Sequence, residues 1–188
     1  MEQIKELTRK LIENSFKEIM LQIPFEKITI KTITDHANII RPTFYNHFHD
    51  KYELMECIVK EEIIDDVRQC LLDGRNDEGI RELFKRFYND RTYYAKCFDI
   101  TGQNGFAEEL SRLLTNLFAE VMKRFVKDKE DIYSSKLKGM TTEMVAEYYS
   151  SGLITMIRQV IKAADGVSVD DLINSYGQLM NHTIFELI

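Results

Sequence analysis

The segment between Phe25 and Tyr52 carries the densest set of side chains that could bind another molecule. Hydrogen-bond donors and an aromatic ring follow one another there within a few residues: Arg41, Thr43, Tyr45, Asn46 and His47. A guanidinium can bond to the edge of a guanine, hydroxyl and imidazole groups can bond to phosphates, and a ring can contact a thymine methyl or a sugar. These residue types together predict a surface that contacts nucleic acid.

Other groups of reactive side chains lack the spacing that their chemistry requires. His47 and His49 are two residues apart, which turns their rings away from each other on a helix and disfavours a shared metal ion. The pairs Glu61–Glu62 and Asp65–Asp66 are typical of solvated helix faces. Three cysteines without a CxxC spacing predict reduced thiols rather than disulfides or a zinc site: Cys57, Cys70 and Cys97. Catalytic glycine-loop, nucleophile-elbow and HExxH motifs are absent from the sequence, so we expect no enzymatic activity, metal or cofactor.

Two short helices joined by a turn would position these donors. Thr29 can cap a first helix that ends just before Asn38, a residue that tolerates the left-handed backbone of a tight turn. A second helix opens near Pro42, because proline suits the first helical turn. Phe44 and Phe48, four residues apart, would face inward and leave the donors on the outer surface. These dimensions are typical of a helix-turn-helix.

Helical periodicity of apolar residues continues along the chain, and no strand pattern competes with it. Apolar residues from Ile4 to Met20 form one stripe along the first helix. Asp50 and Glu53 have the spacing of a capping box, which should open a long helix to about Leu72. Residues 73–79 are the clearest loop. Later helices are expected from residue 80, over 110–125, over 140–164 and over 169–187. The predicted fold is all-α with about nine helices.

The net charge of −6 is unevenly distributed. Residues 1–54 carry eight Lys/Arg and eight Asp/Glu, so the other 17 Lys/Arg and 23 Asp/Glu place the whole negative balance in residues 55–188. A local basic face is enough to bind phosphate, so this acidity does not exclude DNA binding. The sequence shows neither a signal peptide nor an apolar run long enough to span a bilayer, which favours a cytoplasmic protein without membrane contact.

The helix-turn-helix segment resembles the N-terminal signature of the TetR family of bacterial transcriptional regulators. The matching residues are Ile28-Thr29-Ile30, Ile33, Ala37-Asn38-Ile39-Ile40, Thr43-Phe44-Tyr45-Asn46-His47-Phe48 and Asp50-Lys51-Tyr52-Glu53-Leu54. The order of these residues, their spacing and their phase on the helices all agree with that signature. Two positions depart from the family pattern: Asn38 stands where glycine is usual, and Ile40 stands where a small polar cap is common.

The resemblance implies a recognition helix from about Arg41 to Phe48, with phosphate contacts from the positions of Thr29, Tyr45, His47 and Lys51. The complete set of expected DNA contacts is Thr29, Lys31, Arg41, Pro42, Thr43, Tyr45, Asn46, His47 and Lys51. If Tyr45 and Lys51 are exposed, replacing either by alanine should abolish operator binding and cost little stability.

The resemblance also implies two domains, a helix-turn-helix domain over residues 1–50 and an effector-binding and dimerisation domain over residues 51–188. Residues 148–158 resemble the penultimate helix of a C-terminal domain type common in Firmicute members, and two such helices from each subunit would form the dimer interface. The expected interface residues are Ser151, Leu153, Met156, Ile157, Val160, Leu172, Tyr176, Leu179 and Met180. Seven aromatic residues could pack in the core or line an effector pocket: Phe84, Phe87, Tyr88, Tyr94, Phe98, Phe118 and Tyr148.

These expectations combine into a dimer that binds a palindromic operator in double-stranded DNA, with two recognition helices about 34–36 Å apart. Ligand-responsive repression of transcription is the family default, and activation is the alternative. The effector would be an unknown small molecule or protein. A second hypothesis is a co-activator that acts through contact with a metabolic enzyme subunit, as some relatives do, and the acidic C-terminal part favours it. A third is a helical structural module without DNA binding.

Overall fold

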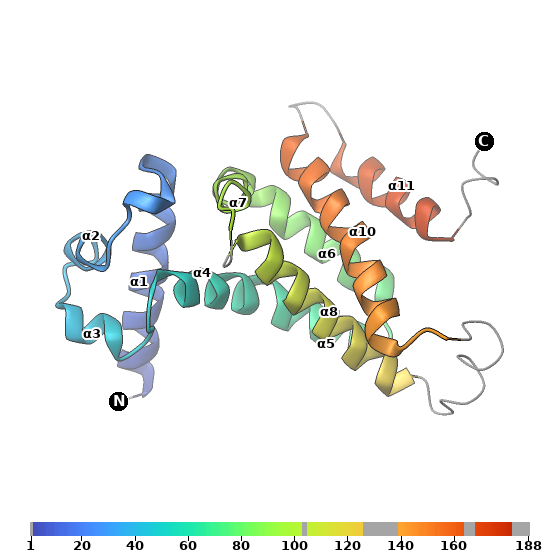
Figure 1. Cartoon of the computed structure of the whole chain (residues 1–188), viewed down its shortest axis with the longest axis horizontal. Helices are drawn as coiled ribbons and strands as arrows, with labels where there is room; N and C mark the ends of the chain where they lie inside the picture. Colours follow the sequence, from blue (N-terminus) through green and yellow to red (C-terminus); the bar gives the residue numbers. More distant parts are fainter. Residues whose placement is uncertain (1, 103–104, 126–138, 164–167, 182–188) are drawn as a thin grey trace.

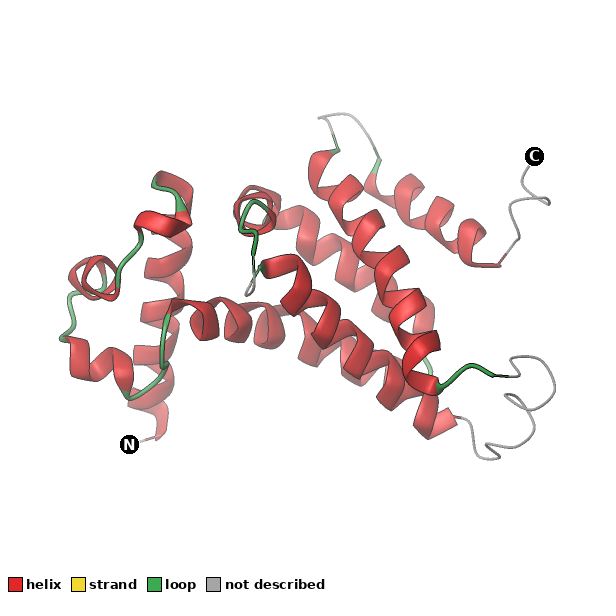
Figure 2. Cartoon of the chain, in the orientation of Figure 1, coloured by secondary structure: helices red, strands yellow, loops and turns green. Residues whose placement is uncertain are grey.

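The computed structural model describes residues 2–102, 105–125, 139–163 and 168–181, and every regular element within these ranges is a helix (Figures 1 and 2). The elements are α1 (Glu2–Gln22), η1 (Phe25–Lys27), α2 (Ile30–His36), α3 (Arg41–Tyr45), α4 (Lys51–Val59), η2 (Lys60–Ile64), α5 (Asp65–Leu72), α6 (Asn76–Asn89), α7 (Arg91–Phe98), α8 (Phe106–Phe125), α10 (Thr142–Lys162) and α11 (Val169–Asn181). The predicted all-α fold is confirmed. We call residues 2–50 the head and residues 51–181 the body; α4 leads from one to the other (Figure 1).

The head is built around the buried side of α1. Its buried apolar residues are Ile12, Phe16, Ile19 and Met20, and they share one core cluster with Ile33 of α2 and Phe44 of α3. In the first turns of α1 the predicted apolar stripe is not buried, because Ile4 is 70% exposed and Leu7 is 65% exposed. Apolar periodicity there does not mark a face of the core.

The helix after the head begins where the sequence predicts. Asp50 caps α4, because its carboxylate accepts hydrogen bonds from the amides of Tyr52 and Glu53 at 2.8 and 2.9 Å. In a standard capping box the carboxylate at the position of Glu53 accepts a hydrogen bond from the amide of the N-cap residue. Here the carboxylate of Glu53 accepts from the amide of His49, one residue before the N-cap. The helix continues to Leu72 as expected, but it passes through η2, a π-helical turn of the kind often found at functional sites.

Ion pairs join α1 of the head to η2 of the body. Lys17 Nζ lies 2.9 Å from the carboxylate of Glu62. A second group contains Arg9, Lys10, Glu13 and Glu61. Glu13 is fully buried, and the cations of this group lie 3.0 and 2.7 Å from its carboxylate. A buried carboxylate requires such partners, and because the same two cations also pair with Glu61 of η2, this group joins the head to the body.

The turn before α6 is shorter than the predicted loop over residues 73–79. Helix α6 begins at Asn76, and Gly74 makes the turn with a φ of 78°. Gly79 lies inside α6, where an added Cβ would come within 3.0 Å of Cδ2 of Leu71 and 3.2 Å of Cβ of Cys70. This glycine therefore serves the close packing of α6 on α5, and a loop is the wrong interpretation of it.

The body packs α6, α7 and α11 around a central pair formed by α8 and α10 (Figure 1). The buried side of α10 carries Leu153, Ile157 and Val160, each with no exposed surface. The ring of Tyr176 on α11 meets the ring of Phe84 on α6 with centroids 5.3 Å apart. None of the described helices combines the length and apolar character that crossing a membrane requires.

Candidate nucleic-acid interface

The turn between α2 and α3 has the predicted geometry. The hydroxyl of Thr29 caps α2 by accepting a hydrogen bond from the amide of Thr32 at 3.1 Å. Ala37, at the end of α2, is buried. Asn38 has a φ of 51°, the left-handed conformation that asparagine tolerates better than most residues. Asparagine therefore supports the tight turn that the sequence predicts at this position.

Helix α3 separates apolar from polar side chains. Phe44 and Phe48 are fully buried, with ring centroids 5.8 Å apart. The helix ends at Tyr45, earlier than the expected end near Phe48, and Asn46 is its C-cap. Six predicted contact residues lie on α3 or directly after it. Arg41, Pro42, Tyr45 and Asn46 are exposed, and Thr43 and His47 are half-buried. The structure therefore gathers these six around one short helix.

Arg41 and Tyr45 are best placed to contact another molecule. Tyr45 is 56% exposed, and its ring rests edge-on against the ring of Phe44, with centroids 5.6 Å apart. Within the described part of the chain, no residue forms a hydrogen bond or ion pair with the guanidinium of Arg41. Lys31 is also exposed, but its ammonium pairs with Asp35 one turn further along α2. A phosphate contact from Lys31 would compete with that pair.

Lys51 has a structural role that the sequence does not reveal. Its ammonium donates hydrogen bonds to the backbone carbonyls of Phe25 and Ile28 at 2.7 and 2.9 Å, and it lies 4.1 Å from the centre of the Phe25 ring. Burial lowers the pKa of Lys51 below its ordinary value. The condition of an exposed side chain is not met at Lys51, so we expect Lys51→Ala to destabilise the head, because two carbonyls would lose their donor. Tyr45 is the better probe of DNA contact.

His47 lies beside other cations of the head. Burial, together with the charges of Lys5 and Arg9, lowers the pKa of His47 below its ordinary value of 6.5. At neutral pH the imidazole is therefore mostly neutral and would give a phosphate only a neutral hydrogen bond. A bound phosphate favours the charged form, so DNA binding through His47 would take up a proton.

We expect operator affinity at fixed salt to rise as the pH falls below 6.5. A charged hydrogen bond is stronger than a neutral one by about 1 kcal/mol, which predicts a gain of about fivefold per half-site. Titration of operator binding between pH 7.5 and 5.5 measures this gain. His47→Gln should flatten the profile, whereas His49→Gln, at a side chain 93% exposed, should leave it unchanged. An unaltered profile in His47→Gln would remove His47 from the interface.

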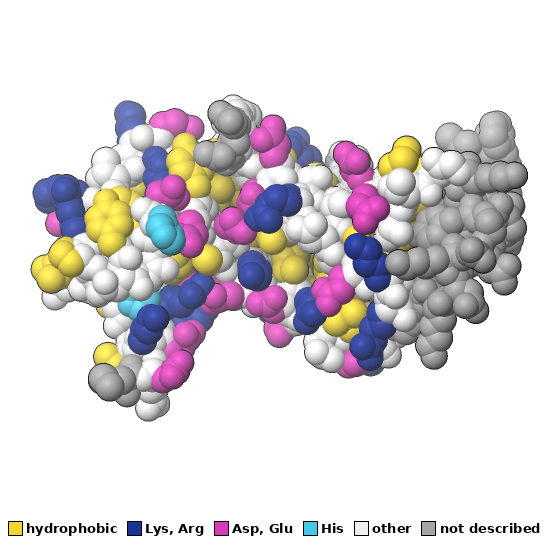
Figure 3. All heavy atoms as spheres, turned by 60° about the horizontal axis from the view of Figure 1, so that its bottom comes forward, with side chains coloured by type: hydrophobic (Ala, Val, Ile, Leu, Met, Phe, Trp, Pro, Cys, Tyr) yellow, Lys and Arg dark blue, Asp and Glu magenta, His cyan; other side chains and the backbone are white. Residues whose placement is uncertain are grey.

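The head presents both signs of charge. Figure 3 shows Lys, Arg and His side chains on the head, at the left, interspersed with Asp and Glu. The equal numbers of acidic and basic residues in the first 54 positions agree with this mixed surface. Contact with phosphates would therefore depend on individual cations near α3 rather than on a uniformly basic face.

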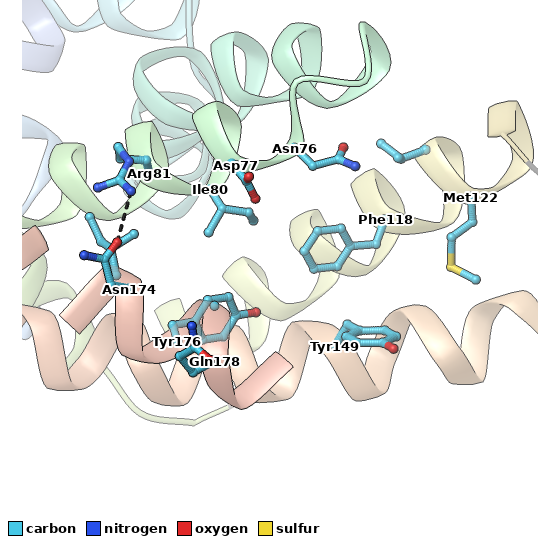
Figure 4. A pocket seen from close by; sticks show the side chains of 13 residues that line it. Asn76, Asp77, Ile80, Arg81, Phe118, Met122, Tyr149, Asn174, Tyr176 and Gln178 are labelled. Atoms are coloured by element: carbon cyan, nitrogen blue, oxygen red, sulfur yellow. Dashed lines mark hydrogen bonds between the residues drawn. The ribbon is translucent and has the colours of Figure 1, made fainter. Parts of the chain in front are cut away.

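A cavity of about 580 Å³ lies in the body between α6, α8, α10 and α11. Figure 4 shows the rings of Phe118, Tyr149 and Tyr176 facing this space, with Arg81 at one end. Arg81 pairs with Asp170 at 2.9 Å and donates to the side-chain oxygen of Asn174 at 3.2 Å, so it links α6 to α11. The volume of this cavity and the residues that line it are typical of a small-molecule site, which combines apolar walls with a few polar groups.

Among the seven predicted pocket residues, only Phe118 lines this cavity. Phe84, Phe87 and Tyr94 are fully buried in the core, and Tyr88 and Phe98 pack against it. Tyr148 is 71% exposed. Sequence periodicity did not identify the other lining residues, because the helices that supply them are far apart in the chain.

The predicted dimer residues divide between the core and the surface. Leu153, Ile157 and Val160 are buried inside the single chain, so no second chain can cover them, and their assignment to an interface is corrected. Met156, Leu172 and Tyr176 also pack against or within the core, whereas Ser151 and Leu179 are exposed. The side chain of Met180 lies outside the described residues. The exposed side of α10 instead carries Met144, Tyr148, Ser151, Gly152 and Thr155.

No cluster of three or more His, Cys, Asp or Glu that could hold a metal ion occurs among the described residues. The thiol of Cys97 is buried, which raises its pKa to about 12, and Cys57 and Cys70 are free and partly buried. A buried thiol with a raised pKa is a poor nucleophile.

Comparison with known proteins identifies similar sequences and structures. A family model for the C-terminal region of TetR-type transcriptional regulators matches residues 76–182. The transcriptional activator DhaS of the dhaKLM operon of Lactococcus lactis subsp. lactis (strain IL1403) is 24% identical over 181 residues, which cover 93% of this chain and 88% of that protein.

Two solved structures share the fold. The structure of a dihydroxyacetone kinase operon activator, DhaS, superposes with a TM-score of 0.61 at 23% identity, over 93% of this chain and 94% of the other. A protein described as a fatty acid metabolism regulator of Clostridium perfringens superposes with a TM-score of 0.58 at 15% identity, over 93% of this chain and 99% of the other.

Proposed function

Because this chain belongs to the TetR family of transcriptional regulators, we propose that it binds a palindromic DNA operator as a homodimer and releases or retains it in response to an effector. The observation that carries the DNA contact is the arrangement of α3. Phe44 on α3 and Phe48 just after it are buried, while Arg41 and Tyr45 stand exposed on a helix that follows a helix-turn-helix turn. This is the arrangement that inserts into a major groove.

Dimerisation is supported by the exposed side of α10. Met144 and Tyr148 are 49% and 71% exposed, and Ser151 and Thr155 follow on the same face of the helix. An added Cβ at Gly152 would meet no atom within 4 Å, so this glycine is not needed for packing inside the chain. Small residues between large apolar ones allow a second helix to approach closely. Two heads in one dimer would match two half-sites.

Effector response is supported by the cavity of the body. Ligand in the space between Phe118, Tyr149 and Tyr176 would touch α8, α10 and α11 together. Because α10 also supplies the exposed residues proposed for the dimer contact, a ligand that changes the packing of α10 would change the separation of the heads. The lining suits a molecule with an apolar body and a polar group that reaches Arg81 or Asn174. Such a ligand shifts DNA binding only if it binds the two states unequally.

The test of the DNA contact is titration of the purified protein with DNA from upstream of its own operon. We expect selective binding whose affinity falls linearly with salt on logarithmic axes, because phosphate contacts release counterions. Fluorescence anisotropy at several salt concentrations, with a scrambled duplex as control, measures the slope and the selectivity. A folded dimer that binds neither duplex at low salt would contradict the proposal.

The sign of regulation is a separate question. Repression is the expectation from the family default, whereas the similar DhaS protein carries the name of an activator. A reporter gene behind the upstream region, with and without the regulator, distinguishes the two.

A second candidate function is co-activation through contact with a metabolic enzyme subunit. The observation that favours it is charge, since residues 55–188 hold the entire net charge of −6. A protein partner that co-purifies with the dimer and binds DNA only through it would support this candidate.

A further inference from the structure

Ile40 occupies a position where its residue type contributes little to the fold. It is the N-cap of α3, and its carbonyl accepts from the amide of Thr43 at 2.9 Å, but its side chain makes no capping hydrogen bond. Serine, threonine, asparagine or aspartate would supply that bond. The α3 helix therefore begins without the side-chain cap that a polar residue would give.

Packing does not explain the isoleucine either. Ile40 is 68% exposed, whereas its neighbour Ile39 is the residue that packs against the core in this turn. The side chain thus leaves a branched alkyl group in solvent and forgoes a cap at the same time. Positions where a sequence breaks local rules without a structural gain are often functional.

The surroundings of Ile40 identify what an apolar group there could contact. Ile40 directly precedes Arg41, and both are exposed at the N-terminal end of the helix proposed to read DNA. Residues at this end of a recognition helix contact base edges in the major groove. The apolar group available there is the C5 methyl of thymine, since cytosine carries only hydrogen at that carbon.

We propose that Ile40 is a specificity-determining residue that packs on the C5 methyl of one thymine in each operator half-site. The inference rests on the proposed function, because it requires α3 to lie in a major groove. Arg41 would supply polar contact to the adjacent base or phosphate, and Ile40 would select thymine over cytosine at its own position.

The experiment uses a duplex that the wild-type protein enriches from a random pool. Each symmetric pair of thymines in that duplex is replaced in turn by deoxyuridine, which removes the methyl and keeps base pairing. For wild type we expect one pair to matter: a contact the size of one methyl is worth about fourfold in affinity, hence about 15-fold for two half-sites. Ile40→Ala should bind the duplexes with and without that methyl equally, within twofold.

Two further variants separate specificity from stability. Ile40→Ser restores a capping hydroxyl, so we expect a higher melting temperature together with the same loss of methyl discrimination. Ile4→Ala removes an isoleucine of similar exposure, 70%, from α1 and should keep full discrimination. The inference is overturned if deoxyuridine weakens wild type and Ile40→Ala equally at every position. A wild-type protein that enriches no duplex overturns the proposed function itself.

Discussion

Replacing Tyr148 by glutamate is expected to convert the dimer into monomers and to lower operator affinity by a factor of about 10²–10⁴. Tyr148 is 71% exposed in the single chain, so the fold of the subunit does not depend on it. In a twofold-symmetric interface along α10, two carboxylates would be desolvated near each other, which is strongly unfavourable. The loss in DNA affinity follows because each head would then bind its half-site alone.

Light scattering after size exclusion and anisotropy on the selected duplex measure the two effects of Tyr148→Glu. Asn116→Glu is the matched control: it introduces the same charge at an exposed residue of α8, beside the groove that faces α4 and α5. This variant should remain dimeric and bind normally. If Tyr148→Glu stays a dimer with unchanged affinity, the exposed side of α10 is not the interface.

The adjacent rings of Phe44 and Tyr45 should respond to alanine in opposite ways. Phe44 has no exposed surface and joins α3 to the core of the head, so Phe44→Ala should destabilise the head by about 3–5 kcal/mol. We expect fast amide exchange in α2 and α3 and loss of DNA binding, with an intact dimeric body. Hydrogen exchange resolved by segment measures this local effect.

Tyr45→Ala should spare the fold and reduce DNA binding. Loss of the edge contact with Phe44 costs about 0.5–1.5 kcal/mol of stability at most. Loss of a hydrogen bond to phosphate costs about 1.5–3 kcal/mol of binding per half-site, which is more than tenfold in Kd. Thermal melting and anisotropy on the same samples separate the two variants. Equal destabilisation by both would show that α3 does not divide core from surface as described.

The sequence by itself determined most of the long helices, the helix-turn-helix and the exposure of Arg41 and Tyr45 on α3. Thr29, Asn38 and Asp50 act on backbone groups within four residues, so capping and turn chemistry could be read locally. The four-residue spacing of Phe44, on α3, and Phe48, just after it, was enough to predict that both are buried. The family resemblance rests on the same local pattern.

Only the tertiary structure decided which apolar faces are buried inside the subunit. Leu153, Ile157 and Val160 follow the same period whether they face α8 or a second subunit, and only the position of α8 shows that they belong to the core. Exposed Ile4 and structural Lys51 were misjudged for the same reason, since their roles depend on groups distant in the chain. The cavity is the extreme case: four helices supply its walls, so no local pattern in the sequence can specify it.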